Sequence, residues 1–197
     1  KSLFTFFNTI NCIDDNIQKF VTFLLENGVD PNTPNNNGVY PLEHAIQISC
    51  FTLVKELINS GKIDFSIRIN DNLSPTKCTK KTYLHLAVEK NDLDVVSLFI
   101  DNKLIDVNVT DSDGRTPLID ACIVENRGII QKLFNVDDLD YLHRDNNGDD
   151  ALSILQNKNP NQTVSPTENK EEYKNNLLWL INQNFSQKKY FSRFDWN

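Results

Sequence analysis

Methionine is absent from the 197-residue chain, which also contains only three histidines and six glycines. Because translation starts at methionine, we expect Lys1 to mark the edge of a processed or trimmed piece of a longer protein. No run of about 18 apolar residues occurs, so the sequence predicts no membrane-spanning helix.

Basic residues are scarce. Twenty Lys and Arg face 27 Asp and Glu, which gives a net charge of −7. Sequence-independent binding to nucleic acid needs clustered Lys and Arg to neutralise phosphates, and anionic membrane surfaces recruit basic segments in the same way. The composition therefore argues against both a nucleic-acid partner and a membrane partner.

The short motifs of metal sites and enzymes are also missing. Four cysteines lie far apart in the sequence, without the C-x₂-C spacing that brings two thiolates onto one metal; they are Cys12, Cys50, Cys78 and Cys122. We expect these to be reduced, buried thiols. There is no Gly-x-Ser-x-Gly elbow, no phosphate-binding loop and no dinucleotide fingerprint. The sequence thus predicts no catalytic residue, no cofactor and no metal.

What the chain does contain is an internal repeat in a composition typical of globular proteins, 39% hydrophobic and 24% charged. Four segments align with one another, namely Asn36–Ala45, Lys81–Ala87, Ser112–Ala121 and Asn146–Leu152. The first and third of them share a glycine turn, then Tyr or Thr, Pro and Leu. The second keeps Thr-x-Leu-His-x-Ala without the glycine, and the fourth keeps the glycine and the Leu but has Asp149-Asp150-Ala151 in place of x-Thr-Pro. Leu84, Leu118 and Leu152 are 34 residues apart, whereas Leu42 precedes Leu84 by 42 residues. The extra length falls in the polar stretch 67–80.

Each repeat predicts a turn followed by two helices. Glycine in the turn can adopt a left-handed backbone conformation without a steric cost. Pro is tolerated at the first helical position because the N–H that it lacks would have no hydrogen-bond partner within the helix. The second helix shows apolar residues at helical spacing, as in Leu93, Val96 and Ile100. Asparagine, present 27 times, falls at turns and at helix breaks such as Asn91 and Asn126, where it tolerates left-handed backbone.

These segments resemble ankyrin repeats, whose signature reads Gly-x-Thr-Pro-Leu-His-x-Ala. Gly114–Leu118 and Thr82–Ala87 carry the closest matches. The resemblance implies an all-α ankyrin-repeat solenoid of about five helix–turn–helix units with β-turn or hairpin connections. We expect an ankyrin-repeat domain over 1–184, with units 1–34, 35–66, 67–109, 110–141 and 142–184, and a capping tail over 185–197.

The histidines and acidic pairs have structural interpretations. His85 occupies the signature position that bonds to the turn, His44 is expected on a helix surface, and His143 is expected to satisfy loop backbone. Neighbouring acids such as Asp149 and Asp150 do not face each other, so solvated charge is favoured over an acid–base pair.

The resemblance also implies a contact surface, made of the residues beside the turn glycine and those late in the first helix. Carried onto this chain, the predicted contact residues are Asn36, Asn37, Val39, Gln47, Lys81, Glu89, Lys90, Ser112, Asp113, Arg115, Ile123, Val124, Asn146, Asn147 and Asp149. Cys78 and Thr79 belong to the same set if the turn of the third repeat, which has no glycine, aligns with the other turns without a shift. The last two turns are expected to be acidic through Asp111, Asp113, Asp145, Asp149 and Asp150, and so to attract a basic partner.

Both ends of the repeat region depart from the pattern. The first unit begins with phenylalanines inside its first helix, and we expect upstream residues or a partner to cover them. The tail alternates aromatic and basic residues; capping of the last helix pair is favoured, with stacking on single-stranded nucleic acid as the alternative.

The predicted function is non-catalytic binding of a protein or peptide on the concave face. The alternative is a substrate-recognition or scaffold portion of a larger multidomain protein, such as a ubiquitin-ligase adaptor or a host-directed effector. The resemblance implies an intracellular location, cytoplasmic or, as an alternative, nuclear. The sequence does not identify the partner or the oligomeric state.

Overall fold

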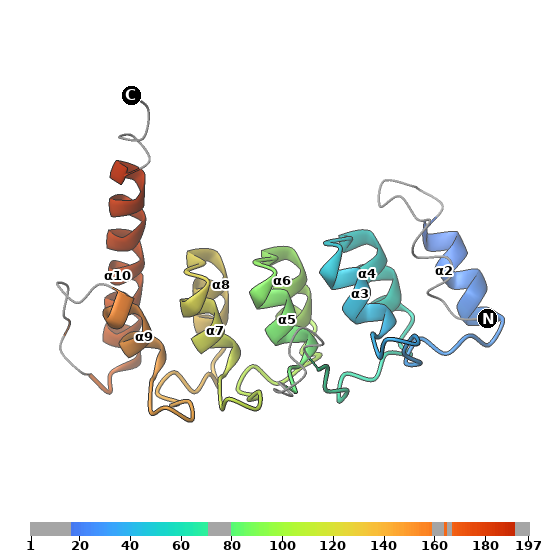
Figure 1. Ribbon diagram of the computed structural model, residues 1–197, viewed down its shortest axis with the longest axis horizontal. Coiled ribbons are helices and arrows are strands. Elements are labelled where there is room, and N and C mark those ends of the chain that lie inside the picture. Colours follow the sequence, from blue (N-terminus) through green and yellow to red (C-terminus); the bar gives the residue numbers. More distant parts are fainter. Residues whose placement is uncertain (1–16, 71–79, 159–163, 165–166, 192–197) are drawn as a thin grey trace. The chain divides into compact units, whose positions relative to one another are not determined.

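The computed structural model describes residues 17–70, 80–158, 164 and 167–191 (Figure 1). The chain divides into two compact units, unit 1 over residues 1–106 and unit 2 over residues 107–197. All regular elements in the described ranges are α-helices. The expected all-α repeat fold is therefore confirmed. The phenylalanine-rich start and residues 192–197 of the expected cap lie outside the described residues, as do Cys78 and Thr79.

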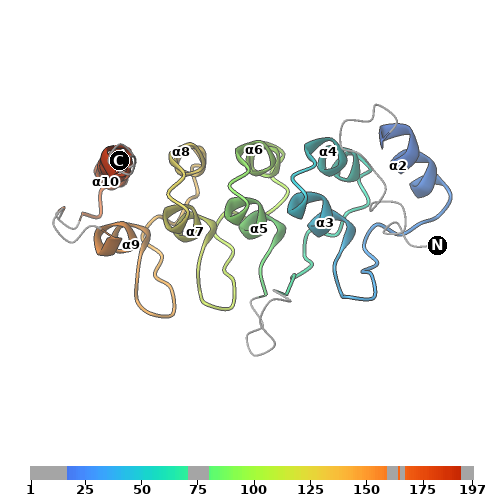
Figure 2. The same cartoon turned by 45° about the horizontal axis from the view of Figure 1, so that its top comes forward.

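Unit 1 consists of two rows of helices. The inner row holds α3 (Pro41–Gln47) and α5 (Tyr83–Glu89), which pack against each other, and the outer row holds α2 (Ile17–Glu26), α4 (Phe51–Asn59) and α6 (Leu93–Asp101). Each inner helix contacts the outer helix that follows it, and α4 contacts both α2 and α6 (Figure 2).

Unit 2 repeats this arrangement. Its inner helices are α7 (Pro117–Ile123) and α9 (Ala151–Lys158), and its outer helices are α8 (Arg127–Phe134) and α10 (Lys170–Phe191). Contacts join α7 to α8 and α9, and join α10 to α8 and α9. With 22 residues, α10 runs past the end that we expected at Asn184.

The inner helices begin at side-chain caps that the signature encodes. Oγ1 of Thr82 accepts a hydrogen bond from the backbone N–H of His85 and lies 2.8 Å from Nδ1 of that buried ring. This confirms the structural role predicted for His85. The fifth repeat replaces the pair by Asp150, which accepts from the N–H of Ser153, while Ser153 Oγ accepts from the N–H of Asp150. Both pairs satisfy N–H groups that have no partner within the helix.

The signature leucines form the inner part of both cores. Leu42 and Leu84 in unit 1, and Leu118 and Leu152 in unit 2, are buried. The outer helices add apolar faces at helical spacing, as in Val95, Val96 and Phe99 of α6. Since a short helix is marginal in isolation, packing of these faces supplies most of its stability.

Candidate functional site

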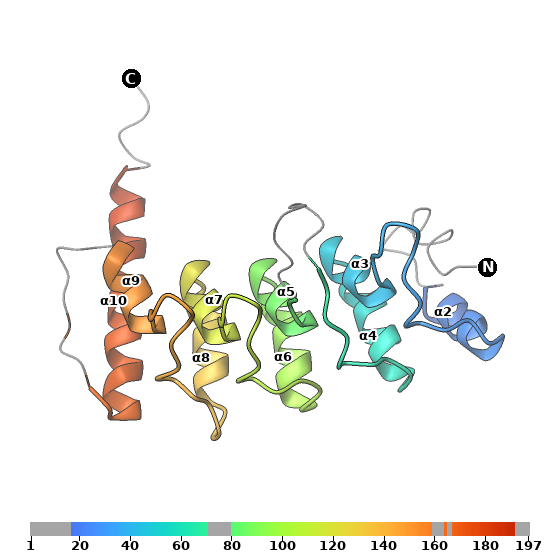
Figure 3. The same ribbon diagram turned by 60° about the horizontal axis from the view of Figure 1, so that its bottom comes forward.

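The turns before α3, α7 and α9 share one hydrogen-bond pattern; the loop that leads into each of these helices can be followed in Figure 3. In unit 1, Oδ1 of Asn35 accepts the N–H groups of Asn37 and Val39 at 2.9 and 3.0 Å. In unit 2, Asp111 and Asp145 do the same for the residues two and four positions further on. These side chains make Asx turns, which fix the tip in one conformation.

This pattern buries two of the five acidic residues that the sequence places in the last two turns. The Asp111 and Asp145 residues are only 7% and 6% exposed, because their carboxylates face the backbone of their own turns. Arg115 further offsets the remaining charge, with Nη1 3.8 Å from Asp113 Oδ2 and Nε 3.9 Å from Asp145 Oδ2. Asp113, Asp149 and Asp150 are half-buried, and the attraction of a basic partner to these turns stays a prediction.

Neighbouring tips in unit 2 are hydrogen-bonded to each other. Asn146 donates its backbone N–H to the carbonyl of Asp113 at 2.9 Å and its Nδ2 to the carbonyl of Ser112 at 3.0 Å. His143 Nε2 lies 2.9 Å from the carbonyl of Gly114, which confirms its predicted contact with loop backbone. The structure thus brings three predicted contact residues together, and part of their polar capacity is used within the protein.

In unit 1 the predicted residues converge on one hollow of about 590 Å³ between the second and third repeats. We call it the inner hollow; it is lined by Asn37, Val39, Glu43, Gln47, Ile69, Asn70, Lys81, Leu86, Glu89 and Lys90. Six of these were predicted as contact residues. The seventh predicted residue of unit 1, Asn36, is exposed at the tip.

Two side-chain pairs shape the walls of the inner hollow. Gln47 Nε2 donates to Glu43 Oε1 at 3.0 Å, and the other oxygen of Glu43 accepts the N–H of Tyr40. Lys81, which lies just before the start of α5, forms an ion pair with Glu89, the last residue of that helix. The paired groups hold their side chains in place, while Lys90 remains exposed at the rim.

The sequence missed four members of the inner hollow, namely Glu43, Ile69, Asn70 and Leu86. Glu43 holds the histidine position of the signature, so only its departure from the motif marked it. Asn70 lies at the start of the long third turn, next to the bridge in which Ile69 and Lys81 exchange backbone hydrogen bonds of 2.8 and 2.9 Å. That bridge confirms a hairpin-like connection and places Asn70 beside the hollow.

The inner face of unit 2 is assembled differently. Ile123 and Val124 are half-buried at the end of α7. Lys158 of α9 inserts its Nζ at this point, 3.5 Å from the carbonyl of Cys122 and 3.0 Å from Glu125 Oε1. Asn147 and Asp149 bond within their own repeat, to Asp145 and Ser153 respectively.

The described side chains bring together no group of three His, Cys, Asp or Glu that could hold a metal ion. Burial raises the pKa of the Cys122 thiol and of the Tyr83 and Tyr173 phenols, which keeps these groups protonated. Burial also lowers the pKa of His44. In each of these groups the shift disfavours the charged form, as expected for packed interior groups.

Within the described ranges, no helix combines the length and apolar character needed to cross a lipid bilayer. No curated protein matches the chain. A family model described as ankyrin repeats in three copies matches residues 10–111 and 65–145. The two matches together cover more than half of the sequence, and the chain therefore belongs to the ankyrin-repeat family.

Proposed function

We propose that this chain is a non-catalytic interaction module that holds a protein or peptide partner on its inner face. Ankyrin repeats are generally protein–protein interaction modules, and rigid stacked repeats present extended binding surfaces. The observation that carries the proposal is the inner hollow, which gathers six of the seven contact residues predicted for unit 1. Its floor is apolar, through Val39 and Leu86, and its rim carries amides and charges.

The hollow suits recognition better than chemistry. The ionisable groups in its walls are engaged with each other, as Lys81 is with Glu89, so they orient a partner rather than activate a reacting atom. Residues at the centre of an interface contribute most of its binding energy, and here the centre is the floor of the hollow.

The test compares partner capture by the wild-type chain with capture by a Gln47→Ala/Lys90→Glu variant. We expect the variant to lose the partner, because both changes lie at the hollow while neither residue is buried. The matched control is Lys55→Glu on the exposed side of α4, which should retain it. Thermal unfolding of all three proteins checks that they fold equally well. Retention by the hollow variant would contradict the proposal.

An enzyme would respond differently. A metal ion or nucleotide that binds only the folded state stabilises it by RT ln(1 + L/Kd), where L is the ligand concentration, and so raises the unfolding temperature as L rises above the dissociation constant Kd. We expect no such shift with divalent metals or nucleotides. A ligand-specific shift would favour an enzymatic function instead.

A further inference from the structure

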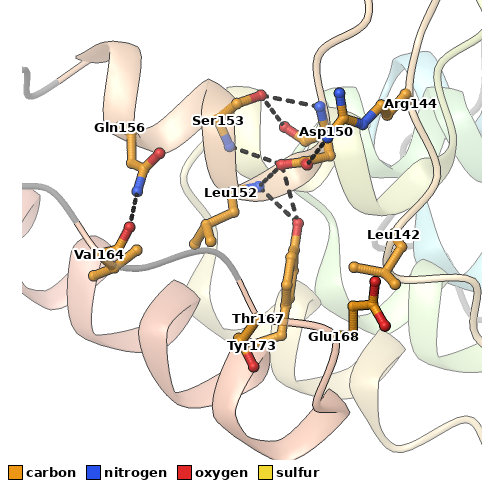
Figure 4. Close-up of a pocket in the computed structure, with 10 residues that line it drawn as sticks. All are labelled: Leu142, Arg144, Asp150, Leu152, Ser153, Gln156, Val164, Thr167, Glu168 and Tyr173. Carbon is orange, nitrogen blue, oxygen red and sulfur yellow. Dashed lines mark hydrogen bonds and ion pairs between the residues drawn. The ribbon is translucent and has the colours of Figure 1, made fainter.

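A second hollow, of about 600 Å³, lies within unit 2 between α9 and the start of α10 (Figure 4). We call it the end pocket. It is lined by Leu142, Arg144, Asp150, Leu152, Ser153, Gln156, Val164, Thr167, Glu168 and Tyr173. None of these residues belongs to the predicted contact set, so the end pocket is a separate feature of the molecule.

The wall of the end pocket is fixed at two points. Gln156 Nε2 donates to the carbonyl of Val164 at 3.0 Å, and the hydroxyl of Tyr141 donates to the carbonyl of Glu168. These bonds join Val164 to α9 and Glu168 to Tyr141. The pocket is thus already formed without a ligand, which lowers the entropy cost of binding.

An exposed leucine lines the end pocket at the sequence position where the preceding repeat has an asparagine that bonds to the next repeat. Asn108 donates to the carbonyl of Asp138 at 2.7 Å and accepts the N–H of Asp140 at 2.8 Å, which joins its repeat to the next one. The equivalent position 34 residues later is Leu142, which is 39% exposed. The end pocket therefore presents an apolar wall instead of a link.

The hydroxyl protons around the pocket are used inside the protein. Tyr173 donates to Asp150 Oδ1 at 3.3 Å, and Thr167 donates to Glu172 Oε2 at 2.7 Å. Ser153 Oγ donates to the carbonyl of Asp150 or to a neighbouring carboxylate. Since a hydroxyl has one proton, these groups offer a ligand only lone pairs.

The polar groups that remain for a ligand are mainly acceptors. They are Oδ2 of Asp150, the exposed carboxylate of Glu168 and the carbonyl oxygen of the Gln156 side chain. Asp150 is held firmly, because its Oδ1 accepts N–H groups from Leu152 and Ser153. The donor at the rim is Arg144, whose side chain is 69% exposed and lies 3.8 Å from Asp150, a contact that water or a ligand can replace.

We propose that the end pocket receives an arginine side chain of a partner protein. The guanidinium supplies five donors to the Glu168 and Asp150 carboxylates, and its methylene stem packs on Leu142 and Val164. This contact goes beyond the inner hollow and needs no partner there. It places a basic residue of the partner at the fifth repeat.

The test titrates the whole chain with N-acetyl-arginine amide and follows backbone and side-chain amide shifts by ¹H–¹⁵N NMR. We expect saturable shifts at Ser153 and at the Gln156 side-chain amide, and none with the neutral isostere N-acetyl-citrulline amide. Agmatine, a free small molecule with the same guanidinium group, is titrated for comparison with N-acetyl-arginine amide. If agmatine binds about tenfold more tightly, the natural ligand is a free small molecule, and the assignment to a partner protein is overturned.

Three variants set the direction of the effect. Glu168→Gln should weaken binding about three- to tenfold, because it removes an exposed acceptor without touching a fold contact of its side chain. Arg144→Ala should strengthen binding, because a competing cation is removed. Glu171→Gln, an exposed acid of α10 outside the pocket, should change nothing. Equal shifts with citrulline, or loss of binding in Arg144→Ala, would overturn the proposal.

Discussion

A Cβ atom added to Gly114 would lie 2.5 Å from Oδ1 of Asn146, the residue that ties the fourth turn tip to the fifth. The same glycine has φ +74°, in the left-handed region that L side chains rarely adopt. Gly148 has a similar φ of +86°, but nothing lies within 4 Å of its added Cβ. The two glycines therefore separate the cost of the backbone angle from the cost of the contact.

Gly148→Ala should lower the free energy of unfolding by about 1–2 kcal/mol, the cost of left-handed backbone alone. Gly114→Ala should cost more, because it also displaces the Asn146 side chain from Ser112 and crowds the Asn146 backbone N–H that donates to Asp113. Urea unfolding followed by circular dichroism measures both. Equal losses in the two variants would show that the tip-to-tip contact contributes nothing to stability.

Lys80 occupies the position of the turn glycine in the third repeat, with φ +40°. Lys80→Gly should raise the free energy of unfolding by about 1 kcal/mol, because glycine has no Cβ to strain that backbone. Lys80→Ala is the matched control and should leave stability close to wild type, since alanine keeps the Cβ. Thermal unfolding of the three proteins distinguishes these outcomes; stabilisation by alanine equal to that by glycine would mean that the lysine side chain, not the backbone, is responsible.

The helices and their caps could be predicted from the sequence because they depend on local chemistry. Thr82 and His85 are three residues apart, and their bond follows from that spacing. Asn91, expected at a helix break with left-handed backbone, has φ +59°, which confirms the expectation. Asn126 does not: its φ is −89°, and it caps α8 by accepting the N–H of Ile129, while the preceding Glu125 has φ +58°.

The binding surface could be predicted only in part, because burial is a property of the packed chain. From the sequence, Asp111 and Asp145 were expected to be charged residues on the surface. In the structure both are buried, because each carboxylate accepts backbone N–H groups of its own turn. The end pocket is lined in part by Val164, which Gln156 of α9 contacts through a hydrogen bond to its carbonyl. No periodic pattern encodes that contact.

Lys158 connects α9 to the end of α7. Its Nζ contacts carbonyl oxygens of the last turn of α7 and Oε1 of Glu125, a buried residue with φ +58°. Since a cation stabilises the negative end of a helix dipole, Lys158→Met should lower the free energy of unfolding by about 1–2 kcal/mol.

The control for this change is Lys174→Met on α10, which is also half-exposed but lies away from a helix C-terminus. It should alter stability by less than about 0.5 kcal/mol. Both variants are compared by urea unfolding at low and high salt. A salt-insensitive loss in Lys158→Met would point to lost packing of the methylene chain rather than to the charge.

Tyr173 joins α10 to the start of α9 through its buried hydroxyl, which lies 2.9 Å from the N–H of Leu152 and donates to Asp150. Tyr173→Phe keeps the ring in contact with Phe134 and Tyr141 but removes these bonds, so we expect a loss of about 1–2 kcal/mol. Tyr141→Phe removes one exposed bond to Glu168 and should cost less. Burial raises the pKa of both Tyr83 and Tyr173, so in ultraviolet titration of the folded wild type these two tyrosines should not ionise below about pH 11, whereas they do after unfolding. Tyr173→Phe should reduce the difference between the folded and unfolded titrations by one tyrosine, leaving that of Tyr83. A full complement of early-titrating tyrosines in the folded protein would contradict the burial of this hydroxyl.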